Sequence, residues 1–406
     1  MTKKKHIVSI EEFDGKNYQI TLVEPEDKAV LTHYLHNVEN GISKHYKKDA
    51  LKVIQNFVEY KENENIHILQ EEALQQLLFE LNNVPFPTPK EYTFKFIDLF
   101  AGIGGFRLAL QNVGGKCVYT SEWDKSAKKT YRENFGETPF GDITKQSTKN
   151  YIPEKFEVLC AGFPCQAFSI AGKRKGFADT RGTLFFDVED IIAKHRPKAV
   201  FLENVKNLVT HDKGKTFKTI VEVLEKKLGY KVFSSVLNSL THANIPQNRE
   251  RIFIVAFDPK QVKNFNKFKF PEKIKLTKTI HDILEKGKQE EKYYYPKSHQ
   301  YYPELKKTMT SKDTVYQWRR IYVRENKSNA CPTLTANMGT GGHNVPLIKD
   351  DFGIRKLTPR ECFSFQGYPK NYILPNLANG KLYMQAGNSV TTTLIERIAN
   401  QIMEVL

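Results

Sequence analysis

The segment FKFIDLFAGIGGFRLALQNVGGKCVYTSEWD, residues Phe94–Asp124, decides the fold of this chain. Its apolar start, Phe94–Phe100, predicts a buried strand, and the glycines of Ala101–Gly105 predict a tight turn. Phe106–Val113 reads as the following helix, and Lys116–Ser121 predicts a second strand. A strand, a helix and a strand in this order form the repeating unit of a parallel α/β sheet. We therefore expect an open, mostly parallel sheet with helices on its faces.

The turn and the end of the second strand indicate a cofactor that carries a nucleoside. Glycines at Gly102 and Gly104 let the backbone approach a ligand and leave helix N–H groups free. Glu122 follows the turn by about 20 positions, where an acid commonly holds a ribose hydroxyl. Trp123 could stack on an adenine or be a core aromatic. Asp142 could receive the adenine amino group or cap a helix.

A second segment, Phe156–Phe186, places a thiol where active sites of such sheets gather. An apolar strand ends at Gly162 and Pro164, and Cys165 stands at the break. The basic loop that follows favours a polyanionic substrate; it includes Ser169, Lys173 and Arg181. Cys165 therefore reads as a nucleophile, whereas a small core residue is the commoner fate of a lone cysteine.

A carboxylate stands at the end of the next strand. Ala199–Glu203 is apolar and stops on Glu203, so Cys165 and Glu203 should face the same cleft. A carboxyl beside a thiol suits a nucleophile–acid mechanism, although a solvent-facing strand end is the simpler explanation. Arg249 and Arg251 alternate along an extended segment and so should share one face. They could hold a substrate oxygen and Glu203, or be surface charges.

The rest of the chain suggests three regions. Residues 1–92 form a charge-rich, helical extension that ends in a Pro-rich linker. Residues 93–260 and 385–406 form the α/β domain. Residues 261–384 form a smaller, irregular domain, in which lysines interleaved with tyrosines and a Gly/Asn/Thr-rich loop at 332–346 suit a DNA surface. We expect helices at 355–368 and 392–405.

Composition limits the kind of partner. The formal net charge of +16 and pI near 9.3 favour a polyanion, although a merely basic protein is not excluded by charge. Five scattered cysteines without a Cys-x-x-Cys pair predict neither a disulfide framework nor a zinc site, and no other metal site is expected. With no apolar leader or membrane-spanning run, we expect a cytoplasmic protein without membrane contact.

Five motifs together resemble those of DNA (cytosine-5) methyltransferases of bacterial type II restriction–modification systems. They occur in this order: Phe96–Gly105 (FIDLFAGIGG), Gly162–Gln166 (GFPCQ), Glu203–Val205 (ENV), Gln247–Arg251 (QNRER) and Gly387–Ser389 (GNS). The resemblance spans residues 94–406 and implies a Rossmann-like, doubly wound, S-adenosylmethionine-dependent methyltransferase domain with a separate target-recognition domain. It leaves residues 1–92 without a role and gives no recognition sequence.

The resemblance also assigns roles. Cys165 would add to C6 of a flipped-out cytosine, Glu203 would protonate or hydrogen-bond ring N3, and Arg249 and Arg251 would lie near the base and the carboxylate. The implied S-adenosylmethionine pocket comprises Phe100, Gly102, Gly104, Glu122, Trp123, Asp142, Ile143, Pro164, Leu184, Asn388 and Val390. The expected DNA contacts are Gln166, Ser169, Lys173, Arg181, Thr335, Asn337 and Gly341.

The implied substrate is double-stranded DNA, methylated by a monomer that protects it from a cognate restriction endonuclease without a stable complex. Two alternatives stay open. One is an RNA (tRNA) cytosine-5 methyltransferase of related fold, against which the long variable region argues. The other is a non-catalytic DNA-binding regulator that uses residues 1–92.

Overall fold

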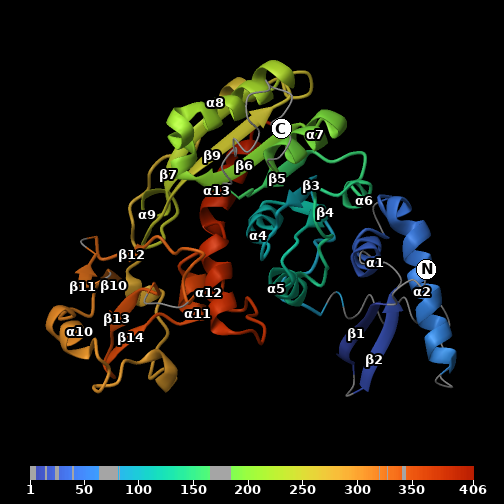
Figure 1. Ribbon diagram of the computed structural model, residues 1–406. Coiled ribbons are helices and arrows are strands. Elements are labelled where there is room, and N and C mark those ends of the chain that lie inside the picture. The colour runs from blue at the N-terminus through green and yellow to red at the C-terminus, as the bar shows by residue number, and fades with distance from the viewer. Residues whose placement is uncertain are drawn as a thin grey trace, which may run out of the picture.

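The computed structural model describes residues 6–13, 16–22, 27–38, 41–63, 81, 83–164, 184–319, 321–326, 328–340 and 344–406. Its centre is a six-stranded sheet (Figure 1) with the strand order β4-β3-β5-β6-β9-β7. The strands are β3 (Phe94–Leu99), β4 (Gly115–Ser121), β5 (Val158–Ala161), β6 (Ala199–Val205), β7 (Lys231–Asn238) and β9 (Glu250–Phe257). The first four in spatial order run parallel, whereas β9 is antiparallel to both of its neighbours. The predicted α/β class with a mostly parallel sheet is confirmed.

Helices cover both faces of the sheet (Figure 1). One face packs against α4 (Gly105–Asn112) and α13 (Thr392–Met403). The opposite face packs against α7 (Leu184–His195) and α8 (Lys215–Glu222). The C-terminal helix therefore returns to the first domain, as its apolar pattern predicted.

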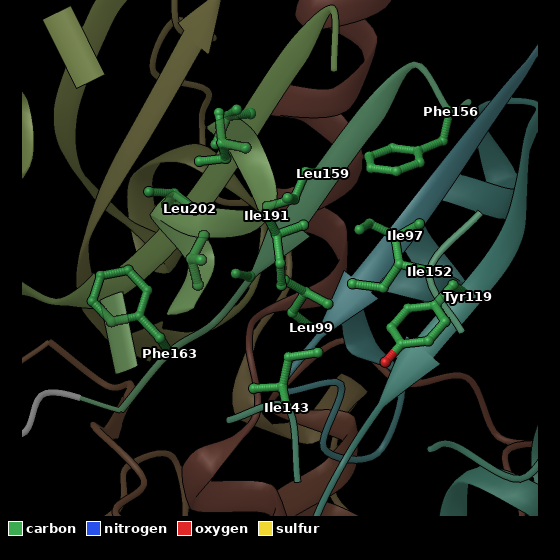
Figure 2. Packing of buried hydrophobic residues seen from close by; sticks show 14 of the residues in the cluster. Ile97, Leu99, Tyr119, Ile143, Ile152, Phe156, Leu159, Phe163, Ile191 and Leu202 are labelled. Carbon is green, nitrogen blue, oxygen red and sulfur yellow. The ribbon is translucent and has the colours of Figure 1, made fainter. Parts of the chain in front are cut away.

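Alternation along the parallel strands explains why both faces are apolar. Phe96 of β3 belongs to the core on the α4 side, and its neighbour Ile97 belongs to the core on the α7 side. Figure 2 shows the second core, in which Ile97 and Leu99 lie near Leu159 of β5 and Ile191 of α7. A strand with both faces covered is apolar at most of its positions. In β3 the exceptions are Lys95 and the buried Asp98, and the four apolar residues of its six serve the two cores.

The described part of residues 261–384 has a small antiparallel sheet of its own. The strand order is β11-β10-β13-β14, formed by β10 (Tyr316–Arg319), β11 (Tyr322–Glu325), β13 (Leu347–Lys349) and β14 (Ile354–Lys356). A short parallel pair, β8 (Gln247–Asn248) with β12 (Cys331–Pro332), connects this region to the main sheet. The other helices from α5 onward are α5 (Lys125–Phe135), α6 (Gln146–Lys149), α9 (Ser239–His242), α10 (Tyr302–Thr308), α11 (Pro359–Ser364) and α12 (Asn379–Asn388).

Two details of this region differ from the sequence prediction. The helix predicted over 355–368 is wrong at its start: β14 occupies 354–356, and α11 begins at Pro359 behind a capping box between Thr358 and Glu361. Pro359 fits the first turn of a helix, where its missing N–H costs nothing. In addition, the expected domain boundary between residues 384 and 385 falls inside α12. We therefore propose that the second domain ends before Asn379.

The N-terminal region contains a hairpin, β1 (His6–Phe13) with β2 (Lys16–Leu22), that the sequence analysis did not predict. It also contains two helices, α1 (Asp27–His36) and α2 (Ser43–Asn63), which lie beside the β4 edge of the main sheet (Figure 1). The Tyr46 hydroxyl donates to the Val118 carbonyl at 2.8 Å, and Thr138 N–H donates to the Thr32 hydroxyl at 3.1 Å. These helices therefore supply hydrogen-bond partners for the sheet edge and for the segment that follows α5.

Candidate active site

A buried ion pair occupies the end of two central strands. Glu203 of β6 and Arg251 of β9 lie on adjacent antiparallel strands, diagonally related because Arg251 pairs with Val205, and Arg251 Nε lies 3.1 Å from Glu203 Oε1. Only 8% of Glu203 is exposed. Burial raises the pKa of Glu203 above its ordinary value, while the charges of Arg251 and Arg249 oppose the rise. A carboxyl with a raised pKa can hold a proton and donate it in a hydrogen bond.

The chain that leads to Cys165 passes beside this carboxylate. A Cβ placed on Gly162 would lie 3.7 Å from Glu203 Oε2, so the backbone after β5 runs along Glu203. The Asn204 side-chain amide donates to the Phe163 carbonyl at 2.8 Å and fixes the last residues before exposed Pro164. Asn204 is a positioning residue that sequence reasoning missed, although its place directly after Glu203 in the ENV motif could have suggested it.

Cys165 itself lies outside the described residues, but the other four cysteines can be assessed. Cys117, Cys160, Cys331 and Cys362 are buried and unpaired. Burial raises the pKa of all four thiols well above the ordinary value, because the thiolate is poorly solvated there. None of the described cysteines is therefore suited to be the nucleophile.

Arg249 and Arg251 make different contacts, although they are only two residues apart. The strand predicted to carry both is interrupted at Arg249, between β8 and β9. The Arg249 guanidinium donates to three backbone carbonyls: Leu334 at 2.8 Å, Gly387 at 3.1 Å and Ser389 at 2.5 Å. Because these carbonyls belong to distant segments, Arg249 connects the main sheet to α12 and the 331–340 segment and reaches Glu203 only through its charge.

The predicted ribose-binding acid is held by the glycine turn. Gly102 N–H donates to Glu122 Oε2 at 2.8 Å, and Asp124 N–H donates to Glu122 Oε1 at 2.7 Å. Burial raises the pKa of Glu122, against the effect of the backbone donors Asp124, Gly102 and Trp123. An ionised carboxylate accepts about four hydrogen bonds, so Glu122 keeps some capacity to accept from a ribose hydroxyl.

The neighbouring candidate residues differ in their surroundings. Trp123 is 78% exposed, so the alternative that made it a core aromatic is wrong. Asp142 Oδ1 accepts from Thr144 N–H at 3.0 Å, while Lys145 is the N-cap of α6, so Asp142 does not cap that helix. Ile143 is buried and packs in the core.

The other candidate cofactor residues described in this part of the site come from three separate segments. Phe100, Gly102 and Gly104 have φ values of 57°, 56° and 80°, a left-handed turn that is costly for Phe100. Leu184 begins α7, and exposed Asn388 ends α12. Val390 packs so closely on the start of α4 that a Cβ on Gly105 would meet its Cγ2 at 2.6 Å. The fold thus brings the C-terminal segment against the glycine turn.

Two of the expected DNA contacts lie on an exposed turn beside α12. Thr335 and Asn337 are exposed, and the Thr335 hydroxyl donates to Asn337 Oδ1 at 2.6 Å. The turn rests on Gly387, where a Cβ would lie 2.2 Å from the Thr335 backbone. The other predicted contacts fall outside the described residues; they are Gln166, Ser169, Lys173, Arg181 and Gly341.

Comparison with known proteins agrees with this geometry. The family model described as C-5 cytosine-specific DNA methylase matches residues 94–404. The Type II methyltransferase M.Bsp6I of Bacillus sp. (strain RFL6) is 52% identical over 308 residues, covering 75% of this chain and 96% of the relative. M.HpaII of Haemophilus parainfluenzae, also a Type II methyltransferase, is 46% identical over 354 residues, covering 84% of this chain and 97% of the relative.

A solved structure supports the fold separately. The crystal structure of S. pombe Dnmt2 methyltransferase superposes with a TM-score of 0.57 at 19% identity, covering 77% of this chain and 99% of that one. No helix in the described ranges combines the length and the apolar character needed to cross a bilayer. The family match extends from β3 to the end of α13 and includes both members of the Glu203–Arg251 pair. The chain therefore belongs to the C-5 cytosine-specific DNA methylase family.

Proposed function

We propose that this protein transfers a methyl group from S-adenosylmethionine to C5 of a cytosine at a specific sequence of double-stranded DNA, as the methyltransferase of a type II restriction–modification system. The Glu203–Arg251 pair beside the Gly162–Pro164 segment carries the proposal. A carboxyl whose pKa is raised lies beside the segment that leads to Cys165, which supports the proposal. The names of the relatives support the restriction–modification context.

The chemistry requires activation of the ring, because C5 of cytosine is too weak a nucleophile to take a methyl group unaided. The target base must first leave the helical stack, at a cost of a few kcal/mol. Glu203 then donates to ring N3, which makes C6 electrophilic, and the Cys165 thiolate adds to C6. After methylation, loss of the C5 proton and elimination of the thiolate restore the aromatic ring.

Arg251 has a positioning role in this scheme. Its ion pair fixes the Glu203 carboxyl and keeps the raised pKa of Glu203 from rising further. Arg249 acts at a distance by keeping the 331–340 segment and α12 against the main sheet.

S-adenosylmethionine, when bound, supplies the electrophilic methyl group. The remaining acceptor capacity of Glu122 would hold a ribose hydroxyl, and exposed Trp123 would stack on the adenine. Asp142 has one carboxylate oxygen turned to Thr144, and the other would take the adenine amino group. The methionine side of the proposed pocket would be closed by Leu184, Pro164, Asn388 and Val390.

The decisive experiment measures tritiated methyl transfer to duplex DNA, followed by bisulfite sequencing of a methylated plasmid. We expect 5-methylcytosine at one recurring sequence and resistance of that DNA to the matching endonuclease. Cys165→Ser should abolish transfer, whereas Cys160→Ala, which alters a buried thiol, should not. Label in tRNA with none in DNA would instead support the RNA methyltransferase.

A covalent trap tests the nucleophile directly. Duplex DNA with 5-fluorocytosine at the target should form a stable adduct through Cys165, because the fluorine cannot leave as a proton does. Methyl transfer without any adduct would refute the covalent step. We further propose a monomer that acts on DNA without the endonuclease, with residues from 261 to the start of α12 reading the sequence.

A further inference from the structure

The second domain contains a cavity of about 350 Å³ that no part of the proposed mechanism uses. The lining comes from the tyrosine run before α10, from Gly339 and Val345, from β14, and from the start of α12. The lining residues are Lys292, Tyr293, Tyr294, Tyr295, His299, Gly339, Val345, Lys356, Asn379, Gly380 and Tyr383. None of these lining residues is acidic.

The most informative residue in this cavity is Lys356. Lys356 lies half-buried on β14 and forms no ion pair with a carboxylate among the described residues. Burial lowers the pKa of Lys356, and the charge of Lys292 lowers it further. A desolvated cation beside a second cation is stabilised by an anion that enters the same cavity. The second cation is only partly neutralised, because Lys292 pairs with exposed Glu290 at 2.8 Å.

Other donors converge on the cavity. The N-cap of α12, Ala378, has no side chain that could cap the first turn, and the first two residues of the helix, Asn379 and Gly380, line the cavity. The Tyr293 hydroxyl accepts from the Asn379 amide at 3.1 Å, which leaves its own proton to donate. Ammonium, hydroxyl and backbone N–H donors without a carboxylate form an environment suited to a phosphate.

The position of the cavity along α12 indicates which phosphate could bind there. The exposed turn runs along α12, with Thr335 packed on Gly387 at one end and Gly339 near Gly380 at the other. Gly387 and Gly380 are separated by seven helical residues, or about 10 Å, which is about three base-pair steps of a duplex. Gly387 also accepts from Arg249, close to the active site. A duplex whose bases meet Thr335 and Asn337 therefore has its backbone within reach of the cavity.

We propose that this cavity, through Lys356 in its lining, binds a phosphate group of the DNA backbone and fixes the register of the recognition domain on the duplex. The proposal rests on the proposed DNA substrate. A phosphate contact adds affinity for any sequence, whereas contacts to base edges discriminate between sequences. Lys356 should therefore contribute equally to cognate and unrelated duplexes.

The test measures duplex binding by the full-length protein over a range of salt concentrations. Lys356→Gln should weaken binding of both duplexes by the same factor, roughly three- to tenfold at moderate salt, and reduce the slope of log K against log salt by about one. Lys356→Arg, which keeps the charge, should restore most of the slope. Lys267→Gln, at an exposed lysine outside the cavity, is the matched control and should change neither quantity.

Three results would overturn the proposal: an unchanged salt slope in Lys356→Gln, an equal change in Lys267→Gln, or a loss confined to the cognate duplex. Competition with inorganic phosphate and with deoxycytidine monophosphate at constant ionic strength identifies the source. If these small anions bind through Lys356 while duplex binding does not depend on it, the DNA assignment is wrong. Methylation by the unaltered protein is a separate readout, so its failure would refute the proposed function instead.

Discussion

The Nε2 atom of His33, on helix α1, accepts a hydrogen bond of 3.1 Å from the backbone N–H of Thr120, on the edge strand β4. His33 Nδ1 lies 2.8 Å from the Ala29 carbonyl, so the ring is neutral and protonated on Nδ1. Both side chains are fully buried. An edge strand exposes unpaired backbone groups unless another element covers them. Here the N-terminal region covers the edge, two residues before Glu122, the acid that we propose to bind the ribose.

The first prediction concerns this bond. His33→Leu should destabilise the protein by about 1–3 kcal/mol, because it leaves the buried Thr120 N–H without a partner. His33→Gln places an amide oxygen at a similar reach and should recover part of the loss. Urea unfolding followed by circular dichroism measures both variants. Equal losses would mean that packing, not the hydrogen bond, is responsible.

The second prediction concerns pH. Burial lowers the pKa of His36 to about 3, Glu137 opposes the shift, and Arg107, His33 and Lys116 add to it. Since the folded-state pKa lies below the ordinary value of about 6.5, the unfolded chain binds the proton more readily. The contribution of neutral His36 to the free energy of unfolding is therefore complete above about pH 6.5. It decreases as the pH falls, by up to about 1.4 kcal/mol per pH unit.

The matched variant for this prediction is His36→Asn, which keeps a polar group for the Thr88 hydroxyl. Its free energy of unfolding should depend less on pH between about 6.5 and 5. Glu137, whose pKa the Arg107 charge holds low against the effect of burial, contributes nothing in that range because it stays ionised. A pH dependence identical to that of the unaltered protein would contradict the assignment to His36.

The third prediction concerns the pH profile of methyl transfer. If protonated Glu203 donates to the base, the rate falls as the pH rises through the pKa of Glu203. Arg251 lowers that pKa, so Arg251→Gln should move the basic limb to higher pH while it reduces the maximum rate. Single-turnover methylation across pH measures the limb. Lys206→Gln removes the exposed Lys206–Glu250 pair at 2.9 Å nearby and should leave the limb in place.

The fourth prediction concerns the close approach between α12 and the exposed turn. Gly387→Ala should destabilise the protein by about 1–3 kcal/mol, because the new Cβ would lie 2.2 Å from the Thr335 backbone. Gly380→Ala in the same helix meets its nearest neighbour, the Gly339 carbonyl, only at 3.4 Å. That control should be neutral or stabilising by up to about 1 kcal/mol, since alanine favours helix. Thermal unfolding of the Gly387→Ala and Gly380→Ala variants measures the difference in stability between them.

The main elements were predictable because their signals are local. β3, α4 and β4 follow from one apolar run, one glycine turn and the next run. The place of Glu203 at a strand end followed from the sequence pattern in the same way. The N-terminal hairpin and β14 were not predicted. β14 has only three residues, and the hairpin strands β1 and β2 have eight and seven; in both cases the pairing partner contributes to an extended conformation that composition alone did not indicate.

The sequence by itself determined the type of sheet and the order of the motifs, and its Glu-Asn and Gly-rich turns marked the ends of strands where chemistry is found. Only the tertiary structure decided which arginine meets Glu203. Arg251 forms the ion pair, and Arg249, two residues earlier, holds three carbonyls from distant segments. The physical reason is that periodicity encodes which side of its own strand a residue occupies. The identity of the partner depends on the segment packed there, which comes from far along the chain.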